Sequence, residues 1–383
     1  MNAQLRKKLG LSDHANTNDK PYQALIRLWT LRMLVPLGGS SELVANYGYT
    51  VDILPIYLDL PPYEDEAYSV KLVITALRKK YTQAESRRTA GGIPVILERN
   101  IERCAQLFGW NETDKAVIAF AILIRTDRVL GHVVGLFQSV TTSRLIDILS
   151  IVLGIERNAI RHSLSPKGLL SVSGFLKVDL HMRLGLSDKL SMLSDALTDR
   201  LRNVDADPFE LLRDMILPTP PGELTLGNFL HIKKTLDILL PYLQRSLENG
   251  TVGVNVLIHG APGTGKTQLA LALARELSCD LFEVSSQDEA GDGIDGMGRL
   301  RAFRAAQSML RPRRALILFD EVEDVFDSDS NFTNRGAVRS QKAWMNHILE
   351  NNPVPVIWLT NNVDCMDPAF LRRFDVLLKM PLP

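Results

Sequence analysis

Residues 260–267 read Gly-Ala-Pro-Gly-Thr-Gly-Lys-Thr, a spacing of glycine, lysine and threonine that suits the binding of phosphate. The three glycines lack a Cβ, so the backbone can turn with positive φ and bring its N–H groups close to an anion. Lys266 is placed to contact β- and γ-phosphate oxygens, and the Thr267 hydroxyl is placed to bind Mg²⁺. The predicted nucleotide-binding residues of this segment are Gly260, Pro262, Gly263, Thr264, Gly265, Lys266, Thr267 and Gln268.

The segments on either side of this loop support the prediction. Residues 254–259 form a strand-like run, and residues 267–277 form a helix-like run. A helix that begins at the loop directs its unpaired N–H groups and its positive dipole end at the same phosphates. A turn that matches the pattern by chance is the alternative, and the order of strand, loop and helix argues against it.

Hydrolysis of a bound nucleotide requires a second carboxylate for Mg²⁺ and a group that orients the attacking water. Residues 315–319 are five consecutive apolar residues, which predicts a strand buried on both faces. Asp320 and Glu321 follow directly, and we interpret them as the Mg²⁺ ligand and the catalytic base, respectively. The alternative is an acidic turn that happens to follow a strand.

A third buried strand is predicted at residues 355–359, and Asn361 follows it. An amide at this position can hydrogen-bond the attacking water or the γ-phosphate, although Asn is also common in turns. Arg372 and Arg373 come next, after a short predicted helix. They are either ordinary surface charge or arginine fingers, which neutralise charge developing on a phosphate.

Four segments and their order along the chain closely resemble the AAA family of P-loop ATPases. These segments are, in order, Gly-Ala-Pro-Gly-Thr-Gly-Lys-Thr, Leu-Ile-Leu-Phe-Asp-Glu, Trp-Leu-Thr-Asn-Asn and Asp-Pro-Ala-Phe-Leu-Arg-Arg-Phe-Asp. The resemblance covers residues 225–383 and implies an αβα sandwich with a parallel sheet, which binds ATP and Mg²⁺ between the subunits of a ring, commonly a hexamer. It implies that Asp320 and Glu321 are the Walker B pair and Asn361 is sensor 1. Arg373 matches the more C-terminal finger, and Arg372 is the candidate for the other.

Three departures from the family pattern bear on function. The family usually separates its two arginines by two residues, whereas here they are adjacent. The expected pore loop, residues 285–298, contains four carboxylates and no aromatic residue, so we expect a poor grip on an unfolded polypeptide. The sequence after residue 379 is too short for the helical lid of the family, so residues 225–383 are expected to hold the large subdomain with the lid absent.

Residues 1–216 show mainly helical periodicity, interrupted by Gly and Pro. Within them, residues 141–180 read as helix, tight turn, helix and one or two short strands at 169–178, an order that resembles a winged helix. The second helix would then present Arg157, Asn158, Arg161 and His162 to DNA bases. The alternative is an adaptor fold that packs against the ATPase or holds a protein partner. The Pro-rich residues 217–224 are predicted to be a linker between the two parts.

The composition limits the function further. The 383 residues carry 44 basic and 44 acidic side chains, so the net charge gives no general signal for nucleic-acid binding. Three widely spaced cysteines and a polar N-terminus predict neither a disulfide framework nor a signal peptide, which suits a cytoplasmic protein. The longest apolar run, residues 116–124, is too short to cross a bilayer and reads as a core helix.

Two functional hypotheses follow from these observations. The first is an ATPase that hydrolyses ATP with Mg²⁺ to remodel or control a client, either a protein or DNA, selected by the N-terminal domain. The second is a nucleotide-dependent switch or scaffold that does little mechanical work, with DNA as a candidate partner through the winged-helix segment. The set of hydrolytic residues favours the first, whereas the loop without an aromatic residue favours the second. Both hypotheses assume a homo-oligomer.

Overall fold

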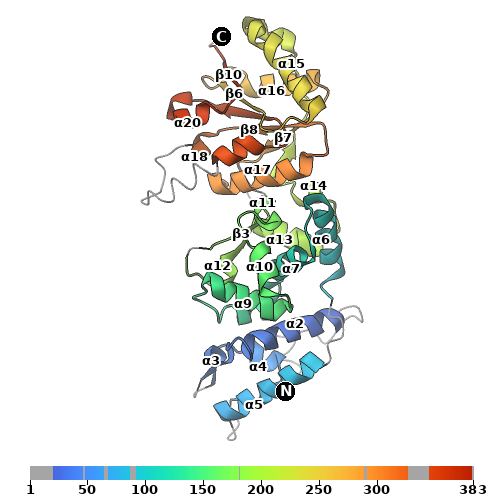
Figure 1. The fold of residues 1–383 in the computed structure, drawn as a ribbon, viewed down its shortest axis with the longest axis vertical. Helices are drawn as coiled ribbons and strands as arrows, with labels where there is room; N and C mark the ends of the chain where they lie inside the picture. Colours follow the sequence, from blue (N-terminus) through green and yellow to red (C-terminus); the bar gives the residue numbers. More distant parts are fainter. Residues whose placement is uncertain are drawn as a thin grey trace. The chain divides into compact units, whose positions relative to one another are not determined.

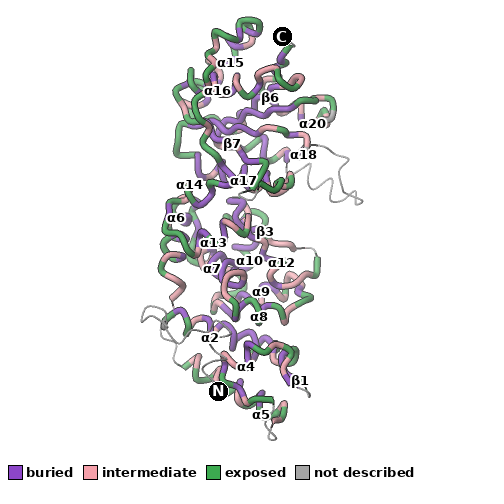
Figure 2. Tube along the Cα trace, turned by 180° about the vertical axis from the view of Figure 1, so that it is seen from behind, coloured by how far each residue is buried: buried purple, intermediate pink, exposed green. Residues whose placement is uncertain are grey.

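The computed structural model describes residues 20–45, 48–63, 68–86, 92–180, 182–288, 291–326 and 345–381. The chain divides into two units, Met1–Leu211 and Leu212–Pro383, which are described separately below. Figure 1 labels their helices and strands, and Figure 2 shows that buried residues run through the inner helices of the first unit and the strands of the second. The predicted fold class, a mainly helical front followed by an α/β sandwich, is confirmed.

The first unit is mainly helical. Its core helix is α7, Glu112–Thr126, in which every residue from Val117 to Ile124 is buried, as predicted for this apolar run. Asn111 and Asp114 form a capping box at the start of α7, which satisfies two of the backbone N–H groups that a helix leaves unpaired there. The elements before α9 are α2 (Lys20–Leu34), α3 (Ser40–Leu43), β1 (Val44–Ala45), β2 (Gly48–Tyr49), α4 (Ile53–Tyr57), α5 (Val70–Ser86), α6 (Val95–Phe108), α7 and α8 (Arg128–Val134).

The remainder of this unit contains a pair of helices and a small sheet. Helix α9, Thr142–Leu153, is capped by the Thr141 side chain and ends at Gly154 in the left-handed conformation. The elements that follow are α10 (Arg157–Ser163), α11 (Leu169–Val172), β3 (Leu176–Val178), α12 (Leu186–Lys189), β4 (Leu190–Met192), α13 (Asp195–Asn203) and α14 (Pro208–Leu211). Strands β3 and β4 pair antiparallel, and Val140 forms an isolated bridge with Leu184.

The strand prediction for residues 169–178 was wrong in part. Residues 169–172 form the short helix α11, and only Leu176–Val178 is a strand, whose partner β4 lies beyond residue 180. A short apolar run has no periodicity that separates a helix from a strand. Gly174, with φ of 78°, turns the chain between the two elements.

The second unit is built on a sheet with the order β10-β6-β9-β8-β7-β5 among the described residues. The first five of these strands are parallel to their neighbours, and β5 pairs antiparallel with β7. The strands are β5 (Ile216–Pro218), β6 (Asn255–His259), β7 (Asp280–Val284), β8 (Ala315–Phe319), β9 (Val356–Thr360) and β10 (Val376–Lys379). The helices are η2 (Leu226–Ile232), α15 (Lys233–Asn249), α16 (Lys266–Glu276), α17 (Gly296–Leu310), α18 (Glu323–Phe326), η3 (Val363–Cys365) and α20 (Pro368–Leu371).

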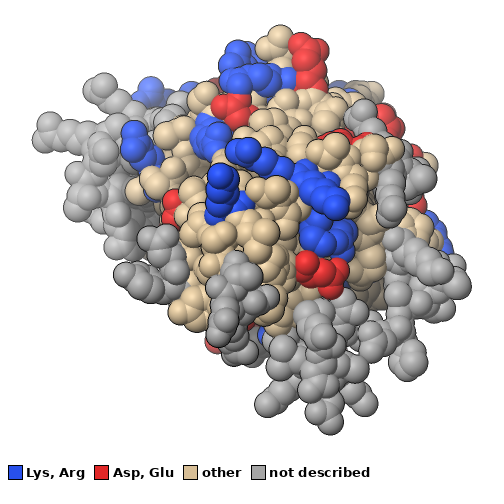
Figure 3. Space-filling view, turned by 90° about the horizontal axis from the view of Figure 1, so that it is seen from below, with Lys and Arg blue, Asp and Glu red and all other residues tan. Residues whose placement is uncertain are grey.

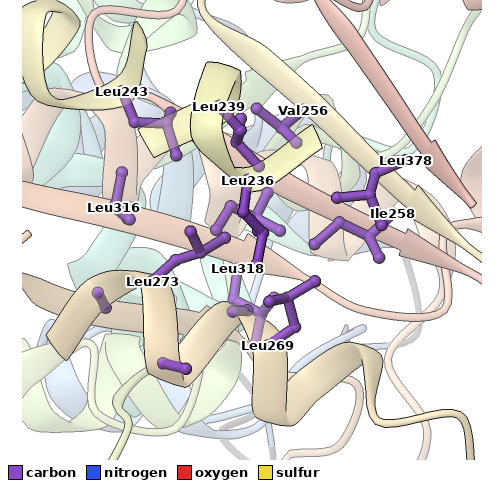
Figure 4. Close-up of a cluster of buried hydrophobic side chains, with 14 of the residues drawn as sticks. Leu236, Leu239, Leu243, Val256, Ile258, Leu269, Leu273, Leu316, Leu318 and Leu378 are labelled. Atoms are coloured by element: carbon purple, nitrogen blue, oxygen red, sulfur yellow. The ribbon is translucent and has the colours of Figure 1, made fainter. Parts of the chain in front are cut away.

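Alternating residues of the strands pack against helices on both faces of this sheet. On one face, Leu316 and Leu318 of β8 join buried leucines of α15 and α16, a cluster drawn in Figure 4. On the other face, Phe319 stacks on Trp358 and contacts Phe303 of α17 edge-on. Figure 1 shows α15 and α16 on one side of the sheet and α17 on the other. Apolar burial on both faces explains why β8 and most of β9 read as continuous apolar runs.

The prediction of a linker at residues 217–224 was wrong at its start. Ile216–Pro218 form the edge strand β5, and the N–H of Thr219 still donates to Leu281 of β7. A proline is tolerated at a sheet edge because one side of that strand has no partner for a backbone N–H. The two units meet in sequence between residues 211 and 212, before the Pro-rich stretch.

None of the helices in the described ranges combines the length and apolar character that a bilayer-spanning segment needs.

Candidate functional site

The phosphate loop joins the end of β6 to the start of α16. The backbone φ angles of Gly260, Gly263 and Gly265 are 151°, 78° and 86°, values that residues other than glycine rarely adopt. A Cβ on Gly260 would lie 2.6 Å from the carbonyl oxygen of Met380, whereas nothing lies within 4 Å of one on Gly263. The loop therefore packs on β10 at one end and stays open at its middle, as a backbone cradle for an anion requires.

Lys266 is the first residue of α16, and its side chain is 8% exposed. Its Nζ donates to the carbonyl oxygens of Gly260 and Ala261, at 2.9 and 3.1 Å, and to Oδ1 of Asn361, at 2.7 Å. Burying the Lys266 ammonium group without an anionic contact costs free energy unless its three N–H donors find acceptors. These contacts hold the charge beside the open loop, where bound phosphates would meet it.

Thr267 and Asp320 meet across the gap between α16 and the end of β8. The Thr267 hydroxyl donates to Oδ2 of Asp320 at 3.3 Å, while Oδ1 of Asp320 accepts from the N–H of Glu321 at 2.8 Å. A hydroxyl and a carboxylate are oxygen ligands of the kind that Mg²⁺ takes together with phosphate oxygens. The open cradle, the lysine and this oxygen pair fit a bound nucleotide and Mg²⁺.

Glu321 is exposed, and its φ is 51°. A residue other than glycine in this left-handed region is uncommon, and such strain gathers at functional sites. Glu321 lines a pocket of about 370 Å³ together with Ser286, Ile294, Arg299, Glu323 and Asn361. The predicted base, Glu321, and the predicted sensor, Asn361, therefore line the same cavity. Asn361 connects this cavity to Lys266 by a hydrogen bond.

Glu323 holds the backbone at Asn361. Its Oε1 accepts from the Thr360 hydroxyl at 2.7 Å and from the N–H groups of Asn361 and Asn362 at 2.6 and 3.4 Å. Burial opposes ionisation of this carboxyl, but these hydrogen bonds outweigh burial and lower the pKa of Glu323.

The predicted finger arginines lie at the opposite edge of the sheet. The backbone N–H of Asp375 donates to the carbonyl of Asn255 and its carboxylate accepts from the Asn255 N–H, so this segment is fixed to the first residue of β6. The phosphate loop follows the last residue of β6, about 13 Å further along the strand. Arg373 pairs with Glu350 at 2.9 Å, and Arg372 is exposed. The chain thus does not bring these arginines to its own phosphate loop.

The predicted pore loop is described except for residues 289 and 290. Gln287 and Gly293 form an isolated antiparallel bridge, and the N–H of Ile294 donates to the carbonyl of Ser286 at 2.8 Å. These contacts close the described part of the loop into a narrow hairpin, and Ser286 and Ile294 at its base reach the pocket of Glu321.

Sequence reasoning missed Glu323 and Arg299. Glu323 had a signal, since it is the third carboxylate after β8, but a carboxylate at a helix start is common on surfaces. Arg299 had no local signal in the sequence. Only the packing of α17 beside β8 brings its side chain to the backbone carbonyls of Asp320 and Glu321.

Comparison with known proteins finds a family match within the second unit. The family described as "ATPase family associated with various cellular activities (AAA)" matches residues 256–382. Protein SAV of Sulfolobus acidocaldarius is 33% identical over 208 residues, which are 50% of this chain and 26% of that protein. The proteasome-activating nucleotidase of Methanoculleus marisnigri is 27% identical over 305 residues, 74% of this chain and 71% of that protein.

A third relative is the ATP-dependent zinc metalloprotease FtsH of Malacoplasma penetrans, 31% identical over 163 residues, which are 39% of this chain and 20% of that protein. The chain thus spans about a quarter or less of the length of two of these three relatives.

Substitution Glu323→Gln tests the role of this carboxylate in stability. A carboxyl whose pKa is lower in the folded than in the unfolded state stabilises the fold at pH values above its ordinary pKa of 4.5. It loses this effect as the pH falls through its folded pKa. The wild type should therefore melt at a higher temperature than Glu323→Gln at neutral pH, and the difference should vanish on acidification below 4.5. Thermal unfolding across this range, with the exposed Glu276→Gln as control, measures it. A difference that does not change with pH would contradict this role.

Proposed function

We propose that the chain, whose residues 256–382 match the AAA family, binds and hydrolyses ATP with Mg²⁺ and uses the cycle to remodel a macromolecular client. The observation that carries this proposal is the convergence of Lys266, Asn361 and the Thr267–Asp320 pair at the carboxyl edge of the sheet. In open α/β sheets, ligands bind at this edge. The cysteine content suits our further expectation of a cytoplasmic protein.

Each residue has one task in this proposal. The loop N–H groups and Lys266 bind the phosphates, and Thr267 and Asp320 hold Mg²⁺, which supplies charge neutralisation when bound. Glu321 accepts a proton from the attacking water, and Asn361 orients that water or the γ-phosphate. The hydrogen bond from Lys266 to Asn361 links phosphate binding to the position of the sensor amide.

The site is incomplete within one chain, which supports assembly into a homo-oligomer. Arg372 and Arg373 lie at the amino edge of β6, away from the phosphates that the same chain binds. In a head-to-tail ring, expected to be a hexamer by family, they reach the nucleotide of the neighbour and neutralise charge there.

The client that we favour is a protein. Two of the relatives above are named as a protease and as a proteasome activator, and we extend the class of protein clients to this chain. Energy from hydrolysis would then be used to move or partly unfold that client. The acidic loop at residues 285–298 lacks an aromatic residue, so we expect a grip on basic or partly folded segments in place of threading of any polypeptide.

DNA is the second candidate, favoured by a specific feature of the first unit. Helices α9 and α10 and the pair β3–β4 follow in the order of a winged helix, and Arg157, Asn158, Arg161 and His162 of α10 are all exposed. Arg157 pairs with Asp147, which reduces its charge. Figure 3, the view from below, shows a separate band of Lys and Arg side chains with few Asp and Glu side chains among them, at the end of the first unit where α5 lies in Figure 1.

Two substitutions separate binding from hydrolysis. Lys266→Ala should abolish ATP binding, because it removes the buried charge beside the loop, whereas Lys234→Ala on the exposed face of α15 should bind normally. Glu321→Gln should bind ATP and retain it, with turnover reduced by about a hundredfold or more, since the base is lost. Titration with a fluorescent ATP analogue and phosphate release measure these outcomes. Unchanged affinity of Lys266→Ala, or normal turnover of Glu321→Gln, would refute the assigned roles.

Arg372→Ala and Arg373→Ala test whether the arginines act on the neighbour. Both variants should bind ATP normally, and the variant that lacks the finger should lose up to about a thousandfold in hydrolysis by the assembled protein. Mixing that variant with Lys266→Ala subunits, which bind no ATP but carry both arginines, should restore hydrolysis. An equal loss in isolated monomers, or no recovery on mixing, would rule out a finger that acts between subunits.

The client class is tested by adding candidate clients separately. An unfolded basic protein should raise the ATPase rate of the chain several-fold, while duplex DNA should leave it unchanged. Arg161→Glu serves as the control, because it should alter only a response to DNA. Stimulation by DNA that disappears in Arg161→Glu would favour the second candidate.

A further inference from the structure

A buried guanidinium lies directly beneath the Walker B carboxylates. Arg299 of α17 is 2% exposed, and its Cζ lies 4.4 Å from the centre of the Phe319 ring. Its Nη1 donates to the carbonyl oxygen of Glu321 at 3.1 Å, and its Nη2 donates to the carbonyl oxygen of Asp320. The side chain thus reaches from α17 to the two consecutive carbonyl groups on either side of the Glu321 Cα. Burying a charge here is costly, so these contacts must matter to the arrangement of the site.

The contacts of Arg299 fall at the strained point of the backbone. Glu321 has φ of 51°, and this conformation persists only where the surroundings determine it. Oδ1 of Asp320 holds the N–H of Glu321, and Arg299 holds the carbonyls of both residues. The backbone conformation that presents the Glu321 carboxylate to the pocket therefore depends on hydrogen bonds from one side chain of α17.

The positive charge of Arg299 also acts on nearby carboxylates. Burial, followed by the neighbouring charge of Asp320, raises the pKa of Glu283 on β7, while the charge of Arg299 acts in the opposite direction. The guanidinium thus faces carboxylates on β7 and after β8. Removing its charge would leave these groups to repel one another at the place where Mg²⁺ must bind.

Arg299 connects this backbone to the acidic loop. Helix α17 begins at Gly296, directly after the loop, and Oδ1 of Asp295 caps it by accepting from the N–H of Gly298 at 2.6 Å. The N–H of Arg299 donates to the carbonyl of Asp295 at 3.0 Å, so Arg299 lies in the first turn of the helix. Ile294 at the base of the loop lines the same pocket as Glu321. A shift of the loop therefore displaces the turn that carries Arg299.

We propose that Arg299 is a positioning residue that fixes the Glu321 carboxylate for hydrolysis and transmits the position of the 285–295 loop to it. The inference rests on the proposed ATPase function, in which Glu321 is the base and the loop meets the client. Arg299 acts in this proposal through the backbone of Asp320 and Glu321. When a client draws the loop away or presses it in, the first turn of α17 moves and the rate of hydrolysis changes.

Substitution Arg299→Lys tests the positioning role with the charge kept. Lysine has no planar fork, so it cannot bond both carbonyls while stacking on Phe319. ATP affinity and KM should stay within about twofold of wild type, while kcat falls by about tenfold to a hundredfold, as expected for a displaced catalytic group. Arg311→Lys, at the exposed end of α17, is the matched control and should leave both constants unchanged. In the Glu321→Gln background, Arg299→Lys should lower the residual rate no further, because both changes remove the same contribution.

A second pair of variants keeps the test valid if Arg299→Lys does not fold. Asp295→Ala removes the cap of α17, and Asp295→Asn retains an acceptor for the N–H of Gly298. Asp295→Ala should lower kcat and weaken stimulation by the unfolded basic protein, whereas Asp295→Asn should match the wild type.

The results distinguish this inference from the proposed function. A wild type without ATPase activity would refute the function itself. A wild type that hydrolyses ATP, with Arg299→Lys retaining its kcat or losing affinity and kcat together, would overturn only the positioning role. The positioning role would also be overturned if Arg299→Lys and Glu321→Gln lowered the rate multiplicatively in the double variant. Equal rates for Asp295→Ala and Asp295→Asn would overturn it as well.

Discussion

Lys266 is held at the carboxyl edge of the sheet by three oxygen atoms, two from its own loop and one from Asn361. The rest of the second unit depends on this arrangement. The loop oxygens require the turns at Gly260 and Gly263, and the amide requires β9 to lie beside β6 in parallel register. A buried ammonium that lost one of these acceptors would retain its desolvation cost with fewer contacts to offset it. The charge thus favours this loop conformation and the pairing of β9 beside β6.

Apolar packing on the two faces of the sheet makes this edge rigid. Leucines of α15 and α16 cover one face, while Phe303 and Trp358 surround Phe319 on the other. Since successive residues of β8 point to opposite faces, the strand packs against both layers and ends directly before Asp320. The carboxylates therefore follow a strand that is buried at every position, which suits groups whose position must be held within a fraction of an ångström.

Residues that act through local chain geometry were predictable from the sequence. The phosphate loop lies within eight consecutive residues, and Asp320 and Asn361 each follow a five-residue buried strand, so order along the chain implied neighbourhood at one edge. Arg299 and Glu323 were not predictable, because their contacts depend on how α17 and the turn after β8 pack. The same limit applies to residues 169–178 and 216–218, where short apolar or Pro-containing runs took their form from partners elsewhere in the chain.

The polar side chains of the second unit gather at opposite edges of the sheet. The carboxyl edge carries the phosphate loop, Asp320, Glu321 and Asn361, whereas the amino edge holds Asp375 and, next to it, the two arginines. A sheet whose strands are joined by hydrogen bonds and buried on both faces moves as one body. In the proposed oligomer, a rotation of the domain that brings its arginines toward a neighbour would therefore also turn its own phosphate loop. Within the same body, α17 is the exception, because its first turn is attached to an exposed loop while its Arg299 reaches the strained backbone at Glu321. Under the proposed function, the domain would thus have two separate mechanical inputs to hydrolysis, one from a neighbouring subunit through the arginines and one from a client through α17.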